Sequence, residues 1–342
     1  MPNCVEGRKY FFLPVNTGYV DGRLPDDRCQ EFYVARSGHG LYCAIVGNVV
    51  IPNGYGSNDV CAEISASERW RRLARGIEDR GARPGIQLSS TWREFQGIRP
   101  FLARDAQNAI AGYKAVMRGM STDDIRETIG NLRRGTELAL RAGFSHIQLH
   151  AAHGYLFSLL IDDAFCQHSE LVLDALVSWA KDVDSASGES SLRFSMLTGD
   201  RRTDEGGRER LVDRLLALPF SFFDVTAGLY NINKQLIYPS TIELLTFRRD
   251  ATVALAHRFA SKQMILSGKS NGAWDTSLPR NVHIGICRDL IANPNFLRDR
   301  AMGCTNCMKC HYYSRGARDL TCGRWELTQA VTGLARGRDS ST

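Results

Sequence analysis

Short apolar segments alternate with longer amphipathic segments along this chain of 342 residues. The short segments are rich in β-branched and aromatic residues, which is typical of buried strands, and the longer ones have the periodicity of helices. Because strands that alternate with helices form parallel sheets, the pattern predicts an α/β fold. The predicted strands cover residues 10–15, 41–50, 84–89, 144–150, 192–197, 222–227, 263–268 and 282–287.

The clearest helix prediction covers residues 122–142. Ser121 and Asp124 have the spacing of a capping box, and Gly143 supplies a C-terminal stop. A second segment with the same periodicity covers residues 241–259. We expect one apolar face of the first helix to pack on the strands. That face consists of Ile125, Ile129, Leu132, Leu138 and Ala139.

Eight strand and helix units in roughly 280 residues favour a single (β/α)8 TIM barrel. An open doubly wound sheet is the less favoured α/β architecture, because no GxGxxG turn follows the first predicted strand. A barrel of this kind carries its chemistry where the strands end, at the C-terminal rim. Residues within the strands fill the core.

Composition narrows the class of protein. Lys and Arg exceed Asp and Glu by 43 to 37, and this small excess is spread along the chain, which argues against nucleic-acid binding. No run of about 18 apolar residues is present, and the N-terminal residues do not have the order of a secretion signal. We therefore expect a cytoplasmic protein that binds no membrane. Its ten cysteines are then expected to be reduced thiols or metal ligands.

The segment HAAHGY ends the fourth predicted strand and concentrates three reactive side chains. His150, His153 and Tyr155 would share one part of the rim. Neutral imidazole N–H groups can donate to a carbonyl oxygen, and a phenol can deliver a proton. An isolated histidine is more often structural, but three such residues together predict a catalytic site.

The segment CTNCMKC and a later cysteine form the second concentration of chemistry. Cys304, Cys307 and Cys310 have CxxCxxC spacing, and eleven residues separate Cys310 from Cys322. Four thiolates at this spacing can surround a [4Fe–4S] cluster. A Cys4 zinc site is the alternative, although such sites usually pair two separated CxxC motifs. The spacing favours iron and sulfur.

Several segments together resemble the old yellow enzyme superfamily of FMN-dependent barrels, over residues 10–325. GFSHIQLHAAHGYLFSLLID resembles its fourth strand and loop, PVNTGYVDGRLPDDRCQEFYVARSGHG its first strand and loop, and IGICRDLIANPNF its eighth strand. GIQL is similar to the third strand. The cysteines make the chain similar to the branch with a [4Fe–4S] cluster, which includes trimethylamine dehydrogenase and 2,4-dienoyl-CoA reductase.

This resemblance implies roles for the HAAHGY residues. His150 and His153 would hold the activating carbonyl of a substrate, the flavin would give hydride to the β-carbon, and Tyr155 would protonate the α-carbon. The reverse direction would oxidise a bound substrate. The residues alone name neither the substrate nor the direction.

The resemblance also implies an FMN site. Gln87 would form hydrogen bonds with the pyrimidine edge of the flavin, and the backbone near Pro14 and Gly47 would lie against the ring. Asn16 stands where trimethylamine dehydrogenase has a cysteine bonded to its flavin, so the FMN is expected to be non-covalent. The expected phosphate site consists of Gly268, Lys269 and Ser270 after the seventh strand and of Cys287 and Arg288 after the eighth.

The chain departs from the family pattern at three places. Alignment of LTGD with the family's LSGD puts Met196 where an arginine normally faces the flavin, with Arg193 three residues earlier as a possible substitute. The family's NxRxDxYGG segment is missing after the fourth strand, so substrate class cannot be carried over. The segment GKSNGAWDTSLPRNV is short for a helical crossover, which predicts an open phosphate end.

We therefore predict an FMN-binding barrel over residues 1–300, a cluster-binding segment over 301–325 and a tail over 326–342. The expected function is that of a flavin-dependent oxidoreductase acting on a small organic substrate. Because few residues follow Cys322, electrons would be exchanged through the cluster with a separate partner, such as a ferredoxin or an electron-transfer flavoprotein. The alternative is a degenerate barrel that keeps the cluster as a structural element and acts as a binding or scaffold subunit.

Overall fold

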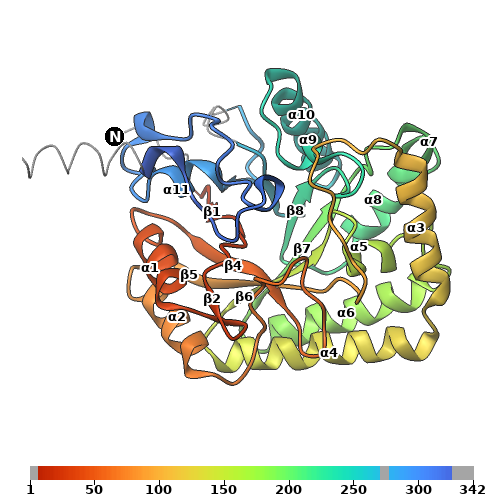
Figure 1. Ribbon diagram of the computed structural model, residues 1–342, viewed down its shortest axis with the longest axis horizontal. Coiled ribbons are helices and arrows are strands. Elements are labelled where there is room, and N and C mark those ends of the chain that lie inside the picture. The colour runs from red at the N-terminus through yellow and green to blue at the C-terminus, as the bar shows by residue number, and fades with distance from the viewer. Residues whose placement is uncertain (1–6, 270–276, 326–342) are drawn as a thin grey trace, which may run out of the picture.

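The computed structural model describes residues 7–269 and 277–325 and shows eight parallel strands that close into a barrel (Figure 1). The order around the barrel is β1, β10, β9, β8, β7, β6, β5 and β4. The prediction of a (β/α)8 TIM barrel is confirmed. Its strands are β1 (Tyr10–Phe12), β4 (Cys43–Val50), β5 (Arg83–Ser89), β6 (His146–Ala151), β7 (Glu189–Ser195), β8 (Phe222–Thr226), β9 (Met264–Leu266) and β10 (Val282–Ile286).

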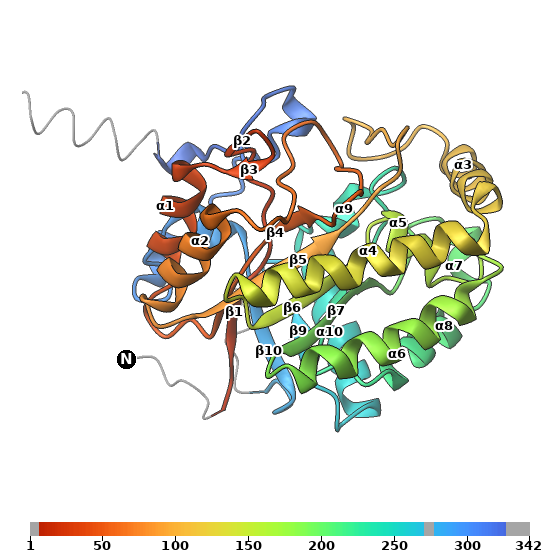
Figure 2. The same cartoon turned by 90° about the horizontal axis from the view of Figure 1, so that it is seen from below.

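Helices surround the strands (Figure 2). Between β9 and β10 the chain passes through residues 270–276, so Ser270 and much of the predicted short crossover lie outside the described residues. No helix in the described part of the chain is long and apolar enough to span a membrane. The helices are α1 (Asp27–Arg36), α2 (Glu68–Glu78), α3 (Ala106–Gly119), α4 (Thr122–Arg141), α5 (Leu156–Leu160), α6 (Ser169–Ser185), α7 (Arg201–Asp204), α8 (Arg208–Ala217), α9 (Lys234–Ile237), α10 (Ile242–Arg258) and α11 (Arg288–Ala292).

Helix α4 begins and ends as its sequence predicts. The backbone N–H of Asp124 donates to Ser121 Oγ at 3.1 Å, and the N–H of Ser121 donates to the Asp124 carboxylate at 2.8 Å. Gly143 has a φ of +98°, a backbone conformation that glycine adopts without strain. Four of the five predicted apolar residues are buried, and Leu138 is half-buried against the core. The helix is therefore fixed on the barrel by its apolar face.

A small antiparallel hairpin was not predicted. It consists of β2 (Val20–Asp21) and β3 (Leu24–Pro25), and it lies in the connection between β1 and α1. Its two turn residues, Gly22 and Arg23, both have positive φ angles. The Asp-Gly pair in VDGRLP is the local signal for such a turn.

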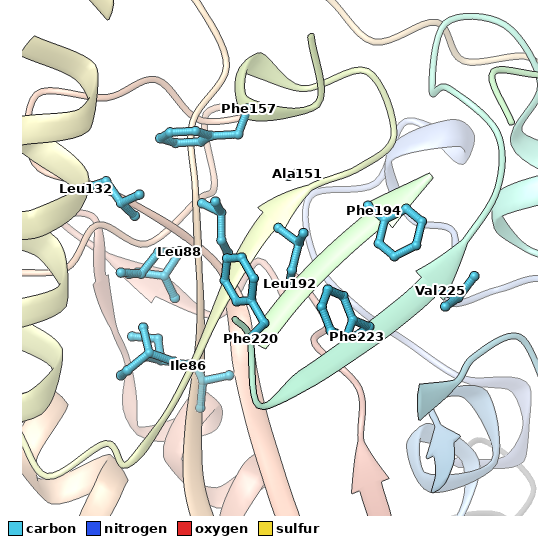
Figure 3. Close-up of a cluster of buried hydrophobic side chains, with 14 of the residues drawn as sticks. Ile86, Leu88, Leu132, Ala151, Phe157, Leu192, Phe194, Phe220, Phe223 and Val225 are labelled. Carbon is cyan, nitrogen blue, oxygen red and sulfur yellow. The ribbon is translucent and has the colours of Figure 1, made fainter. Parts of the chain in front are cut away.

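Successive side chains of a strand point alternately to the layer between strands and helices and to the inside of the barrel. Leu192 and Phe194 of β7 belong to the large cluster between strands and helices, so Arg193 between them points to the inside of the barrel. Figure 3 shows part of the outer cluster, in which Leu132 of α4 lies with strand residues. A separate apolar cluster fills one part of the barrel interior and comprises Phe11, Leu13, Cys43, Ile45, Phe222 and Ile265.

The segment after α11 packs on the barrel and contains two short 3₁₀ helices, Arg300–Met302 and Tyr313–Arg315. It is coloured blue in Figure 1. The N–H of Leu320 donates to the carbonyl of Thr17 at 2.8 Å, and the hydroxyl of Tyr313 donates to the carbonyl of Gly97 at 3.0 Å. Leu320 is buried in the main core. The predicted tail, residues 326–342, lies outside the described residues.

Candidate active site

One pocket at the C-terminal rim of the barrel collects side chains from most of the strands. Pro14 follows β1, Gln87 lies in β5, His150 ends β6, Arg193 lies in β7, and Cys287 follows β10. The cysteine-containing segment supplies another wall through residues 310–314. The pocket is therefore formed jointly by the barrel and by the segment after it.

Nearly all residues predicted for catalysis and FMN binding line this pocket. Gly47 of β4 is not among the lining residues, and Ser270 lies outside the described residues. A Cβ on Gly47 would lie 2.9 Å from the Cβ of Gln87 and 3.3 Å from that of Pro14, so glycine allows those two residues to approach. The predicted residues that line the pocket are Pro14, Asn16, Gln87, His150, His153, Tyr155, Arg193, Gly268, Lys269, Cys287 and Arg288.

The two histidines contact each other directly. His150 Nε2 and His153 Nδ1 are 3.1 Å apart, and the backbone N–H of His153 donates to Ser195 Oγ at 3.0 Å. A turn in which both His153 and Gly154 have positive φ returns the chain toward the strand end. The ring of Tyr155 lies 4.8 Å from that of His150, centroid to centroid. The loop thus brings both imidazoles and the phenol together.

Burial keeps these groups uncharged at neutral pH. Desolvation lowers the pKa of His150 to about 3, with the positive charge of Arg193 as the second cause and its own backbone carbonyl opposing. Desolvation, Arg193, His150 and Arg248 all lower the pKa of His153 well below its ordinary value. Desolvation raises the pKa of Tyr155 well above its usual range. Each histidine therefore carries one N–H, and Tyr155 keeps its proton.

A polar layer lies inside the barrel below the histidines. Gln87 Nε2 donates to Gln148 Oε1 at 2.6 Å, and Arg193 forms an ion pair with Asp224 at 3.0 Å. Asp224 is fully buried on β8, directly beside Arg193 in register. Because this carboxylate holds the guanidinium from one side, Arg193 is fixed at the wall of the pocket.

Arg193, rather than Met196, is the residue of β7 that reaches the pocket. Met196 follows the strand and is buried in the outer core, away from the lining residues. The alignment with LSGD placed Met196 at the flavin and so predicted that the arginine of this site was lost. The pocket does contain an arginine of β7, namely Arg193. The scaffold alternative was based on this loss and on the missing loop after the fourth strand, so one of its two supports is removed.

The far end of the pocket is cationic. Lys269 and Arg288 line it, and no aspartate or glutamate is among its lining residues in the described ranges. Arg288 donates through Nη2 to the carbonyl of Pro239, while its buried Nη1 has no hydrogen-bond partner. A buried, unpaired guanidinium N–H is costly unless an acceptor occupies the space beside it. This end is therefore suited to an anion such as a phosphate.

The residues of this site can be matched to the parts of FMN. A phosphate acceptor would pair the free N–H of Arg288, and a flat ring could lie between Gln87 and the HAAHGY residues. Arg193 would supply positive charge at the side of the ring. The residues present therefore fit the cofactor.

Asn16 lines the pocket and contacts a buried thiol. Its Nδ2 donates to Cys61 Sγ at 3.2 Å and lies 3.5 Å from Asn58 Oδ1. Desolvation raises the pKa of Cys61, so this thiol stays protonated. An amide cannot form a thioether, and non-covalent cofactor binding stays a prediction.

The four cysteines predicted to bind a cluster lie in one region. Cys307 and Cys322 form a side-chain hydrogen bond, and the Cys304 and Cys322 thiols lie near enough to Cys310 to contribute to its raised pKa, of which burial is the main cause. The backbone N–H of Asn306 donates to Cys304 Sγ at 3.3 Å. Within residues 7–269 and 277–325, however, no three histidine, cysteine, aspartate or glutamate side chains converge as a metal site.

A tyrosine wall was missed by the sequence reasoning. The pocket is also lined by four tyrosines, Tyr230, Tyr238, Tyr312 and Tyr313. His311 lies among them, with its ring 4.4 Å from that of Tyr238. The sequence HYYSRG after the last CxxC cysteine was the available signal for two of them, because aromatic residues beside a functional segment favour ligand contact.

A TIM barrel with this rim pocket is an architecture compatible with a flavin-binding oxidoreductase. Residues 15–170 match the family described as NADH:flavin oxidoreductase / NADH oxidase. This match covers less than half of the chain. The chain is thus similar to the flavin-dependent oxidoreductases of the old yellow enzyme superfamily, and this similarity supports FMN as its cofactor.

Similar proteins cover most of the chain at low identity. The NADH-dependent flavin oxidoreductase iliE of Hypocrea jecorina (strain QM6a) is 23% identical over 326 residues, which span 80% of each chain. A 2-naphthoyl-CoA reductase structure, solved with 2-naphthoyl-CoA, has a TM-score of 0.69 at 15% identity and covers 92% of this chain but 54% of its own. The old yellow enzyme homologue from Zymomonas mobilis has a TM-score of 0.62 at 17% identity, covering 86% and 88%. At these identities the solved structures support the fold alone.

Proposed function

We propose that this protein uses FMN, bound non-covalently in the rim pocket, to reduce the activated C=C bond of a small carbonyl compound or to catalyse the reverse oxidation. The observation that carries the proposal is the single pocket that joins two neutral histidines, a protonated phenol and a cationic wall. The bound flavin would supply or accept the hydride.

Each side chain of HAAHGY has a separate task in this proposal. His150 orients the substrate carbonyl, since a neutral imidazole N–H donates to oxygen without giving up its proton, and His153 holds the His150 ring through the contact between their nitrogens. Tyr155 holds a proton that it delivers to the α-carbon. Its burial suits this task, because the phenol stays protonated throughout the neutral pH range.

Charge in the pocket favours a neutral or anionic substrate. A protonated amine would need a carboxylate or another counter-charge, and neither aspartate nor glutamate lines the pocket in the described ranges. Arg193, Lys269 and Arg288 would repel such a cation. The tyrosine wall offers flat apolar faces to a conjugated substrate. An unsaturated ketone or thioester meets these requirements better than an alkylamine.

For the cofactor, we assign Gln87 and Arg193 to the flavin ring and Gly268, Lys269 and Arg288 to the phosphate. Cys287 and Asn16 would lie beside the ring without bonding to it covalently. The similarity of residues 15–170 to the flavin oxidoreductase family supports FMN binding. The residue roles belong to the proposal.

We also propose that Cys304, Cys307, Cys310 and Cys322 hold a [4Fe–4S] cluster. The support is their spacing, their common neighbourhood and the backbone N–H that already donates to Cys304 sulfur. The thiols do not converge in the structure, so cluster binding requires their side chains to rotate toward one another. Iron and acid-labile sulfide measured after anaerobic purification test this assignment. About four irons per chain would support it, and a Cys310→Ser variant with unchanged iron content would oppose it.

The cluster would exchange single electrons with a separate redox protein of the ferredoxin or electron-transfer flavoprotein type. Cys310 supports this route, because the residue that would hold the cluster also lines the flavin pocket. Barrel residues 1–300 and the segment 301–325 would then act as one electron-transfer unit.

The experiment that tests the oxidoreductase proposal is anaerobic turnover of the FMN-loaded protein with 2-cyclohexen-1-one. NADH and reduced methyl viologen serve as alternative electron donors. Flavin reduction by at least one donor, followed by reoxidation when the enone is added, is the expected result. A folded protein that binds FMN but is reduced by neither donor would contradict the proposal.

A further inference from the structure

A buried arginine outside the pocket is connected to the histidine pair by hydrogen bonds. Arg248 lies in the second turn of α10 and is 2% exposed. Its Nη1 donates to Thr226 Oγ1 and to Ser267 Oγ, both at 3.1 Å, and its Nη2 donates to the carbonyl of Leu236. None of these groups was singled out by the sequence reasoning.

The chain of hydrogen bonds continues from Thr226 to the pocket. Thr226 Oγ1 lies 3.2 Å from His153 Nε2, and His153 Nδ1 lies 3.1 Å from His150 Nε2. The last atom of the chain, His150 Nδ1, is buried and has no hydrogen-bond partner. His150 lines the pocket, so the chain of hydrogen bonds ends at a pocket residue.

Two proton arrangements satisfy the contacts between the histidines, and they have opposite directions. In one, the hydroxyl of Thr226 donates to His153 Nε2, His153 Nδ1–H donates to His150 Nε2, and His150 carries its proton on Nδ1. In the other, every donor becomes an acceptor, and His150 Nδ1 is a bare lone pair. Since each neutral imidazole has a single N–H, no mixed arrangement keeps both hydrogen bonds.

Arg248 selects between the two directions. A guanidinium can only donate, so Arg248 occupies Thr226 Oγ1 as an acceptor. The hydroxyl proton then needs an acceptor, and His153 Nε2 is the one that the structure offers. Ser267 behaves in the same way, because it accepts from Arg248 and donates to the carbonyl of Val225 at 2.8 Å. If His153 donated instead, the buried Thr226 proton would have no acceptor.

We propose that Arg248 is a positioning residue that fixes both histidines as Nδ1–H tautomers, so that His150 presents an N–H donor to the pocket. This inference rests on the proposed function, because an N–H donor on His150 is needed only if His150 activates a substrate carbonyl. Burial lowers the pKa of Arg248 to about 9, followed by repulsion from Arg193, and Asp224 opposes both. Arg248 therefore remains charged at pH 7 and can hold this direction.

Nitrogen-15 NMR of histidine-labelled, FMN-loaded protein reads the tautomers directly, with resonances assigned by a His150→Gln variant. The expected result is protonated Nδ1 and unprotonated Nε2 on both rings in the unmodified protein. Protonated Nε2 on His150 or His153 would overturn the proposal.

Two pairs of variants test the assignment to Arg248 and Thr226. Arg248→Met and Thr226→Val should lose the fixed tautomers, whereas Thr226→Ser retains the hydroxyl and should keep them. Arg249→Met is the matched control, since Arg249 is exposed and pairs only with its neighbour Asp250 in the described contacts. Should Arg248→Met fail to fold, the Thr226 pair decides. Native tautomers in folded Thr226→Val would overturn the proposal.

The rate of enone reduction distinguishes a failure of the role of Arg248 from a failure of the proposed function. The kcat/KM for 2-cyclohexen-1-one should fall at least about tenfold in Thr226→Val, with reduction of the flavin by its electron donor unchanged. The tautomers are also measured on protein without FMN. Protein with the predicted tautomers but no enone reduction would defeat the proposed function and leave the role of Arg248 standing.

Discussion

At the scale of single residues, the site depends on burial that keeps reactive groups neutral. His150 is 4% exposed, and its nearest strong charge, Arg193, is positive. Both conditions oppose a second proton on the imidazole. Tyr155 stays protonated for the corresponding reason. The pocket therefore presents hydrogen-bond donors over a wide pH range without changing its charge near neutrality.

Replacing Tyr155 with Phe should remove the proton donor and leave the pocket shape nearly unchanged. General acid catalysis contributes about 10²- to 10⁴-fold, so the rate of enone reduction should fall by at least about 10²-fold. Flavin reduction by the electron donor should continue, because the phenol has no part in it. Stopped-flow absorbance measures the two half-reactions separately. Equal loss in both would show a structural defect instead.

Stability should decrease as the pH falls from about 6.5 toward 3. The folded-state pKa of His150 is lowered to about 3 from the ordinary 6.5, so in this window the unfolded chain binds a proton that the folded chain excludes. His311, with a pKa lowered to about 3 by burial, acts in the same direction.

Urea denaturation at pH 7 and pH 4.5 measures this effect. His150 alone should cost about 2 to 3 kcal/mol of unfolding free energy over that interval, by the conversion of roughly 1.4 kcal/mol per pKa unit. A His150→Gln variant should show a correspondingly smaller decrease. Identical pH dependence in both proteins would mean that His150 is accessible to protons in the folded state.

At the scale of secondary-structure elements, one lysine joins three parts of the chain. Lys234 at the start of α9 donates through Nζ to the carbonyls of Ile98 and Arg99 at 2.7 and 3.1 Å and to Ser314 Oγ at 2.8 Å. Its ammonium also lies 4.3 Å from the centre of the Tyr230 ring. Lys234 therefore fastens the cysteine-containing segment and the loop after β5 onto the rim.

Substituting Lys234 with Met should release this segment. Charge-assisted hydrogen bonds contribute about 1.5 to 3 kcal/mol each, so their loss should expose the segment to cleavage by trypsin at Arg315. Mass spectrometry of limited digests under native conditions measures the rate. The control is Lys181→Met, which changes an exposed lysine of α6. Unchanged cleavage in the Lys234 variant would contradict the role assigned to it.

The strands and main helices were predictable because their signals are local. Short apolar runs rich in β-branched and aromatic residues identified the eight strands, and the Ser121 capping box and Gly143 identified the ends of α4. Contacts such as that of Lys234 with Ser314 join residues 80 positions apart, and a local sequence pattern cannot predict them. The same holds for Arg248, because its proposed role depends on its hydrogen bond to Thr226 of β8.

At the scale of the whole molecule, the barrel has an apolar interior cluster and a polar rim. Phe11 and Phe222 belong to the interior cluster, whereas Gln87, Arg193 and Asp224 belong to the polar layer toward the pocket. Barrel geometry predicted that chemistry would gather where the strands end. It could not predict the tyrosine wall, because Tyr230 and Tyr238 follow β8 whereas Tyr312 and Tyr313 belong to the segment after the barrel, and only the folded rim brings them together.

The central claim is that this rim pocket binds FMN, and a titration of apoprotein with FMN tests it most directly. We expect one FMN per chain, measured by loss of flavin fluorescence and by a shifted visible spectrum. Binding should weaken at least about tenfold when Arg288→Met removes a phosphate partner, and exposed Arg249→Met should bind normally. Folded protein that leaves FMN free at micromolar concentrations, or Arg288→Met protein that binds it unchanged, would contradict the account.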